Sequence, residues 1–229
     1  KVKDRLFAIA NDIIKLAAAR ELVNGIKINT EKKLLEDFPK SAGFDYTKDQ
    51  KRSIKEIFAD LSSGRVMDRL LSGDVGFGKT EVAMNAMLAV VLDGFQALFI
   101  CPTTLLASQH FHGIQKRFSE FGIKVAKLDG KTSAKEKTSI KKALENGDIQ
   151  IVIGTHSLLS VKTKDLALVI IDEEHKFGVK QKEKLKQLRE DVHIFSMSAT
   201  PIPRTLNLAL SKLKGMSSLL TPPTERLGV

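Results

Sequence analysis

The stretch GDVGFGKT, from Gly73 to Thr80, combines spaced glycines with a lysine and a threonine. Its G-x-x-x-x-G-K-T spacing is typical of a phosphate-binding loop. Glycines let the backbone turn tightly and aim several N–H groups at one anion, and the start of the following helix adds positive potential. A glycine-rich turn without a ligand is the alternative. The spacing predicts that a nucleotide's phosphates contact Gly73, Asp74, Val75, Gly76, Phe77, Gly78, Lys79 and Thr80, with Lys79 on the β- and γ-phosphates and the Thr80 hydroxyl on Mg²⁺.

A run of acids in LVIIDEEH, residues 168–175, is the second candidate site. Asp172 follows an apolar segment, and ligands of open α/β sheets bind at the carboxyl ends of such strands. We expect Asp172 to hold Mg²⁺ in its outer shell, and Glu173 to orient and deprotonate an attacking water. A solvated acidic turn is the alternative, but three adjacent carboxylates are costly there without a cation.

The base of the nucleotide is expected to be adenine, since the sequence has no N-K-x-D stretch of the kind that reads guanine. In FDYTKDQ, residues 44–50, the amide of Gln50 is a candidate for contacting the adenine edge. Phe44 is a candidate for stacking on the base. Taken alone, Gln50 would be interpreted as a surface glutamine.

Short apolar segments alternate with amphipathic ones from about residue 68 onward. This alternation predicts an α/β fold in which a mostly parallel sheet carries helices on both faces. The expected strands are 69–72, 97–101, 124–128, 149–154, 166–172 and 193–198. The expected helices lie near 79–93, 105–120, 133–145, 177–189 and 202–212.

The upstream residues have a different pattern. Apolar residues recur at helical spacing over residues 1–24, which predicts one connecting helix. Residues 25–50 contain the turn-rich PKSAGF and are expected to form a linker that includes the adenine-reading segment. A second helical stripe, Ile54, Ile57, Phe58 and Leu61, should end near Ser63.

The composition fits one well-buried globular domain of 229 residues. A formal net charge of +10 favours an anionic partner such as nucleic acid, with a solvated lysine-rich surface as the alternative. The single cysteine, Cys101, excludes an internal disulfide and is expected to be a small buried hydrophobe. No Cys/His spacing suggests zinc, and a cytoplasmic location is expected.

Six segments resemble the motifs of superfamily 2 helicases and translocases, and they follow one another along the chain in the order expected for that superfamily. GDVGFGKT is similar to motif I, DEEH at 172–175 to motif II, and SAT at 198–200 to motif III. PTTLLASQH at 102–110 and GTHSLL at 154–159 are similar to motifs Ia and Ib, and FDYTKDQ to the adenine-reading motif. The resemblance implies that Ser198 and Thr200 relay the state of the nucleotide, with His175 as intermediary. It also implies DNA contacts by Thr103, Thr104, Thr155, His156 and Arg204.

Ordinary structural roles remain open for several of these residues. Thr104 could cap a helix that starts at Leu105. His156 could be a plain loop histidine, and Arg204 could form a surface salt bridge. The insertion KSAG, residues 40–43, leaves open whether Phe38 or Phe44 packs near the base.

Within this superfamily the chain resembles the RecG-like translocases and, more specifically, bacterial transcription-repair coupling factors. The similar stretches include ATPIPRTL at 199–206, Phe77 followed by EVAM at 81–84, and DEEHKFGV at 172–179. The resemblance implies a first RecA-like motor lobe over 51–215 and a segment, 216–229, that leads to a second lobe. It implies ATP hydrolysis and translocation on double-stranded DNA, with RNA polymerase and excision-repair proteins bound by other domains. A RecG-like remodeller of branched DNA and a nucleotide-gated binding module without turnover are the alternatives.

Overall fold

A computed structural model describes residues 23–178, 181, 184, 185, 188, 190–200 and 214–223 of the chain. The helix expected over 1–24 lies outside these residues except at its end. There, Asn24 pairs with Arg65 in an isolated antiparallel bridge, so a helix does not continue through Asn24. The helix expected over 202–212 lies entirely outside the described residues.

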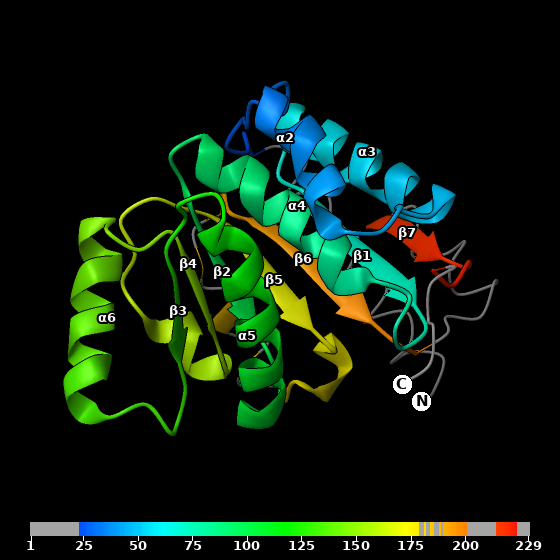
Figure 1. Cartoon of the computed structure of the whole chain (residues 1–229). Coiled ribbons are helices and arrows are strands. Elements are labelled where there is room, and N and C mark those ends of the chain that lie inside the picture. Colours follow the sequence, from blue (N-terminus) through cyan, green and yellow to red (C-terminus); the bar gives the residue numbers. More distant parts are fainter. Residues whose placement is uncertain are drawn as a thin grey trace, which may run out of the picture.

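The described residues form one seven-stranded sheet in which all paired strands run parallel (Figure 1). Its strand order is β3-β4-β2-β5-β6-β1-β7, so the chain crosses over repeatedly between strands. Six of the strands match the expected segments closely, and the expected fold class is confirmed. The strands are β1 (Asp68–Gly73), β2 (Gln96–Ile100), β3 (Val125–Leu128), β4 (Ile151–Gly154), β5 (Leu166–Asp172), β6 (His193–Ser198) and β7 (Gly215–Leu219).

Helices connect the strands. None of the described helices is both long and apolar enough to span a bilayer. The helix expected over 177–189 does not begin at Phe177, which is non-helical. The α-helices are α2 (Lys33–Asp37), α3 (Lys48–Ser62), α4 (Lys79–Leu92), α5 (Thr104–Ser119) and α6 (Ala134–Asn146), and the 3₁₀ helices are η1 (Phe38–Ala42), η2 (His156–Ser160) and η3 (Glu174–Lys176).

The two faces of the sheet carry separate apolar clusters. In β2, Ala97 and Phe99 belong to the cluster under α3, α4 and α5, whereas Leu98 and Ile100 belong to the cluster on the opposite face. This alternation follows from the two-residue period of a strand. The sheet is therefore covered on both sides, as its apolar central strands require.

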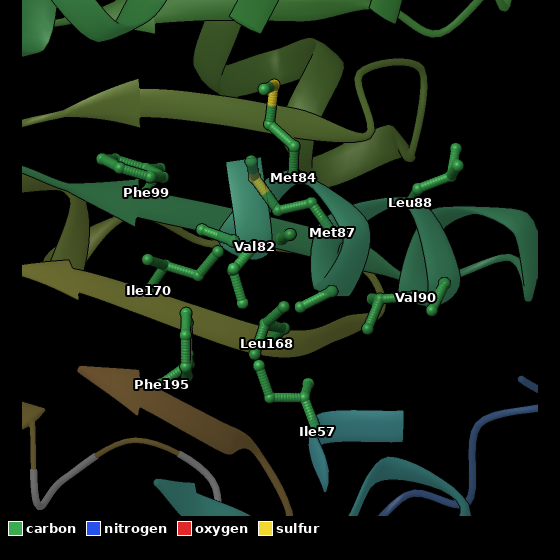
Figure 2. Close-up of a cluster of buried hydrophobic side chains, with 14 of the residues drawn as sticks. Ile57, Val82, Met84, Met87, Leu88, Val90, Phe99, Leu168, Ile170 and Phe195 are labelled. Atoms are coloured by element: carbon green, nitrogen blue, oxygen red, sulfur yellow. The ribbon is translucent and has the colours of Figure 1, made fainter. Parts of the chain in front are cut away.

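Helix α4 lies at the centre of the larger cluster, and every residue from Glu81 to Val90 is buried. Figure 2 shows side chains of α4, among them Val82 and Met87, packed against Leu168 and Ile170 of β5. Ile57 approaches the same cluster from α3. Because this helix starts directly after the glycine-rich loop, its burial fixes the position of that loop.

Two segments differ from the sequence-based expectation. Residues 25–50 are not a loose linker, because Ile28, Leu35 and Phe38 are buried in the larger cluster. The sheet also continues past residue 215, the expected end of the lobe, because β7 pairs with β1. Both segments therefore belong to the core of the domain.

His193 connects the early part of the chain to the sheet. Its Nδ1 accepts a hydrogen bond from Met67 N (2.9 Å), and its Nε2 donates to Ile26 O (2.6 Å). The side chain has no exposed surface, and burial lowers the pKa of His193 below its ordinary 6.5. The folded state therefore holds this imidazole neutral.

This arrangement predicts that the free energy of unfolding decreases as the pH is lowered. Below about pH 6.5 the unfolded chain binds a proton at His193 that the folded chain does not bind. The folded state therefore loses up to about 1.4 kcal/mol of stability per pH unit. Chemical unfolding at pH 7.5 and pH 5.5 measures the difference. The variant His193→Gln should be less stable at pH 7.5 and should show a smaller loss on acidification. An equal loss in both proteins would show that His193 is not the titrating group.

Candidate nucleotide-binding site

The glycine-rich loop joins β1 to α4. Gly76 and Gly78 have φ values of 84° and 83°, the left-handed region in which glycine carries no Cβ penalty. Gly78 is the N-cap of α4, so the unpaired N–H groups of the first helical turn lie at the loop. Val75 at the loop tip is 78% exposed. This loop therefore presents backbone donors at a helix N-terminus, which suits an anion.

Lys79 folds back over the loop. Its Nζ donates to the carbonyl oxygens of Gly73 (2.6 Å) and Asp74 (3.0 Å). Burial lowers the pKa of Lys79, and the charges of Glu173, Asp172 and Asp74 offset part of this effect. A phosphate bound at the loop would offer the ammonium group a stronger, charged partner than these carbonyls.

Gln50 supports the loop from α3. Its Nε2 donates to Phe77 O (3.0 Å), and its Oε1 accepts from Thr47 N (2.8 Å) within a capping box that starts the helix. The residue has no exposed surface, so its interpretation as a surface glutamine is wrong. A Cβ placed on Gly78 would lie 2.1 Å from Gln50 Nε2. Gln50 and the loop are therefore in direct contact.

A cavity of about 480 Å³ is lined by residues that precede Gln50 in the sequence and by Lys51, which follows it. Phe44 is 38% exposed, and its ring centroid lies 5.9 Å from that of Tyr46. Phe38, by contrast, is fully buried against Phe118. Of the two phenylalanines considered for the base, only Phe44 therefore lines the cavity. The lining residues are Pro39, Lys40, Gly43, Phe44, Asp45, Tyr46 and Lys51.

A buried polar network ties the cavity wall to α4. Tyr46 Oη donates to Glu81 Oε1 (2.5 Å), and Asn85 Nδ2 donates to Tyr46 Oη (3.1 Å). Arg117 of α5 also donates to Glu81 Oε1 (2.6 Å). Tyr46 belongs to FDYTKDQ and Glu81 to EVAM, but neither pattern shows that the two side chains meet.

The acids of motif II lie where β5 ends. Asp172 is 7% exposed. Glu173 adopts φ 54° and ψ 55°, the only left-handed non-glycine among the described residues. Such a conformation costs roughly 1–3 kcal/mol and clusters at functional sites. Hydrogen bonds on both sides hold it: Glu173 N donates to Met197 O (2.9 Å), and Glu173 Oε1 accepts from Ala199 N (2.9 Å).

The link between motifs II and III is therefore made by Glu173 itself. His175 Nδ1 lies 3.2 Å from Glu173 Oε2, so His175 contacts the acid that bonds to Ala199 N, and its role as intermediary stays a prediction. Ser198 Oγ accepts from Thr200 N (3.1 Å), which shapes the SAT turn. Glu174 has other partners: it accepts a hydrogen bond from Ser196 Oγ (2.6 Å) and forms an ion pair with Lys214.

His110, which sequence reasoning did not single out, joins the two halves of the site. Its Nε2 lies 3.0 Å from Asp172 Oδ2, and its Nδ1 lies 3.4 Å from Thr80 Oγ1. Cys101 completes a cluster in which the ligand atoms of Cys101, His110 and Asp172 lie within 4.8 Å of one another. Burial and the Asp172 charge raise the pKa of Cys101 above its usual range, so this buried thiol stays protonated.

The expected DNA contacts follow other strands at the same edge. Thr103, after β2, is exposed and caps α5 by accepting from Leu106 N (3.3 Å). The helix begins at Thr104, so the idea that Thr104 is the cap is wrong. His156 is exposed after β4, whereas Thr155 is only 8% exposed. Arg204 lies outside the described residues.

The fold and the site define a nucleotide-binding domain of the helicase type. Residues 47–209 match the DEAD/DEAH box helicase family, and the chain belongs to this family. Membership implies ATP binding.

Among curated proteins, the chain is similar to Transcription-repair-coupling factor. It is 58% identical to that of Helicobacter pylori (strain J99) over 99% of this chain and 23% of that protein. It is 44% identical to that of Bacillus subtilis (strain 168) over 100% of this chain and 20% of that protein. The expected resemblance is confirmed, and the chain spans about a fifth of the length of these relatives.

Solved structures agree with the fold. RecG bound to a three-way DNA junction superposes with a TM-score of 0.85 and is 42% identical, covering 97% of this chain and 30% of that chain. A DEAD box protein from Methanococcus jannaschii has a TM-score of 0.61 and 23% identity, covering 83% of this chain and 54% of that chain. The second likeness shows the fold alone.

The contact between Gln50 and the loop predicts that Gly78→Ala is damaging. A left-handed alanine costs roughly 1–2 kcal/mol, and the clash with Gln50 adds about 1–3 kcal/mol of overpacking. Gly94→Ala is the matched control, since Gly94 has φ 88° with no atom within 4 Å of an added Cβ. Thermal unfolding should show a larger loss for Gly78→Ala. Equal losses would mean that the contact with Gln50 is readily displaced.

Proposed function

We propose that this chain is the first motor lobe of an ATP-driven double-stranded DNA translocase of the coupling-factor type. One observation carries the proposal: the phosphate loop and the acids of motif II converge at one edge of the sheet. His110 contacts both, through Thr80 and Asp172. The identity of 58% to a coupling factor favours that type. A cytoplasmic location accords with it.

ATP would lie along this edge. Its phosphates contact the loop from Gly73 to Thr80, and Lys79 exchanges its carbonyl partners for the β- and γ-phosphates. Adenine enters the cavity beside Phe44. Gln50 is buried and bonded to Phe77 O, so we assign it the role of fixing the loop beside the base.

The donor set fits Mg²⁺, which prefers oxygen ligands and retains several waters. The Thr80 hydroxyl and the Asp172 carboxylate are oxygen donors brought within reach of one imidazole. Thr80 and Asp172 would hold the ion. When bound, Mg²⁺ neutralises charge on the phosphate oxygens. Glu173, fixed by Ala199 N and Met197 O, orients the attacking water and accepts its proton.

Hydrolysis is expected to need a second lobe. In related motors the second lobe supplies arginine fingers, which can contribute ~10³–10⁵ in rate. The chain supplies the loop, the metal ligands and the base, and it covers 23% of a coupling factor. We therefore expect nucleotide binding with very slow turnover by the chain alone.

Duplex DNA is the proposed track. Thr103, Thr104, Thr155 and His156 contact its backbone, and Arg204 faces DNA or the second lobe. Hydroxyl and N–H contacts to phosphate position a duplex without reading its sequence. In the whole protein, other domains would bind RNA polymerase and excision-repair proteins, so that translocation displaces a stalled polymerase and recruits repair.

A second candidate is a remodeller of branched DNA. The likeness to RecG, with a TM-score of 0.85 and 42% identity, favours it. The higher identity to coupling factors outweighs this likeness. Comparing stimulation of the whole protein's ATPase by linear duplex and by a three-way junction would separate the two candidates: a marked preference for the junction would favour the remodeller.

Nucleotide binding is the first test. In the variant Lys79→Ala, loss of the charged donor should weaken ATP binding by about tenfold to a hundredfold, because hydrogen bonds to charged groups contribute about 1.5–3 kcal/mol. Isothermal titration with a non-hydrolysable ATP analogue measures this change. Lys55→Ala, on the exposed face of α3, is a control for loss of one positive charge. Unchanged affinity in Lys79→Ala would refute the phosphate-loop assignment.

Turnover is the second test. Steady-state ATP hydrolysis by the chain should stay close to zero with or without duplex DNA, because the second lobe is missing. Glu173→Gln should bind ATP like the wild type and show no turnover when the second lobe is supplied. Clear turnover by the chain alone, lost in Lys79→Ala, would show that it completes its own site and would contradict the half-site account.

A further inference from the structure

One imidazole lies between the two expected magnesium ligands. His110 Nδ1 is 3.4 Å from Thr80 Oγ1, and His110 Nε2 is 3.0 Å from Asp172 Oδ2. These three residues come from α5, from the start of α4 and from the end of β5. Three elements that are far apart in the sequence therefore meet at one side chain.

The ring is held in place. Its centroid lies 4.9 Å from that of Phe99 in β2, and the His110 side chain is 19% exposed. The Asp172 side chain is 10% exposed. Because both groups are largely removed from water, their hydrogen bond competes little with solvent and fixes the orientation of the carboxylate.

The partners determine where the protons lie. An ionised carboxylate only accepts hydrogen bonds, so His110 Nε2 carries the hydrogen. In a neutral imidazole Nδ1 is then an acceptor, and here it lies 3.4 Å from the Thr80 hydroxyl, at the long end of hydrogen-bond range. A threonine hydroxyl that donates its hydrogen to His110 keeps its lone pairs for a cation. One imidazole can thus orient both oxygen donors.

We propose that His110 is a positioning residue that holds Thr80 and Asp172 in the arrangement that receives Mg²⁺. The inference rests on the proposed nucleotide site and adds to it a residue outside the loop and the acids. Its hydrogen bonds are made to the metal ligands and not to the metal, and such partners commonly contribute about tenfold to a hundredfold to metal affinity. It is not a catalytic residue, because it reaches the reacting groups only through Thr80 and Asp172.

Three variants separate this role from simple packing. His110→Phe keeps a ring against Phe99 and removes both nitrogen atoms. His110→Gln can keep a donor toward Asp172. His112→Ala is the matched control, because His112 lies on the same helix, is exposed and contacts only Ser108 O among the hydrogen bonds described for it. Thermal unfolding of each variant establishes that it is folded.

The measurement is the affinity for mant-ADP, a fluorescent nucleotide, in EDTA and over a series of Mg²⁺ concentrations. In His110→Phe, the Mg²⁺ concentration that gives half of the metal-dependent gain should rise by about tenfold to a hundredfold. Affinity in EDTA should stay at the wild-type value. His110→Gln should fall between wild type and His110→Phe, and His112→Ala should match wild type.

The outcomes distinguish the proposed nucleotide site from the role of His110. If wild type fails to bind mant-ADP, or Lys79→Ala binds it equally well, the proposed nucleotide site is wrong. If wild type binds and His110→Phe shows the same Mg²⁺ dependence, the role of His110 is wrong. Should His110→Phe fail to fold, His110→Leu replaces it, since leucine also lacks hydrogen-bonding atoms toward Thr80 and Asp172. An unchanged Mg²⁺ dependence in a folded His110→Leu then overturns the proposal.

Discussion

Parallel pairing of the strands is the constraint on which the rest of this structure depends. When strands run parallel, all their carboxyl ends lie at one edge, so the segments that follow them are brought together whatever their distance in the sequence. Here β1 leads into the glycine-rich loop, β2 into Thr103, β5 into the acids and β6 into SAT. The candidate site is thus assembled by topology, and the side chains only refine it.

The refinement is done by buried polar contacts that cross between elements. Gln50 joins α3 to the loop, Glu173 joins motif II to motif III, and His110 joins α5 to both halves of the site. Each contact is largely shielded from water, so breaking it would leave a buried polar group without a partner, which typically costs about 1–3 kcal/mol. The site is therefore held in register by a few specific bonds on an apolar frame.

The apolar frame was largely predictable from the sequence. Central strands such as β5 are continuous apolar runs, and an amphipathic helix such as α3 shows a 3.6-residue period. β7 was missed because GMSSL has no apolar run; it is an edge strand with serines, and its pairing with β1 is a tertiary effect. Residues 25–50 were taken for a linker because α2 is too short for its period to be seen. Ile28 nonetheless packs fully into the core.

The site was predictable to the extent that it follows from local spacing. Loop glycines and adjacent acids form short patterns, and their positions in the fold agree with the segments expected from the sequence. Cys101 belongs to no such pattern, and His110 is only the last residue of PTTLLASQH. Their proximity to Asp172 exists only once β2, α5 and β5 are packed. The contact of Gln50 with adenine stays a prediction from the resemblance, and its bond to Phe77 O is a partner that the sequence does not show.

Asp49 shows how the candidate site is connected to the chain beyond the sheet. Its Oδ2 accepts hydrogen bonds from Leu220 N (2.9 Å), Thr221 N (3.0 Å) and Thr221 Oγ1 (3.1 Å). Although burial acts to raise it, these bonds and Arg52 hold the pKa of Asp49 below its usual range, so the carboxylate stays ionised. Asp49 is the neighbour of Gln50, which contacts the loop. A change in the loop that displaced Gln50 would therefore act on the start of α3 and, through Asp49, on the residues after β7.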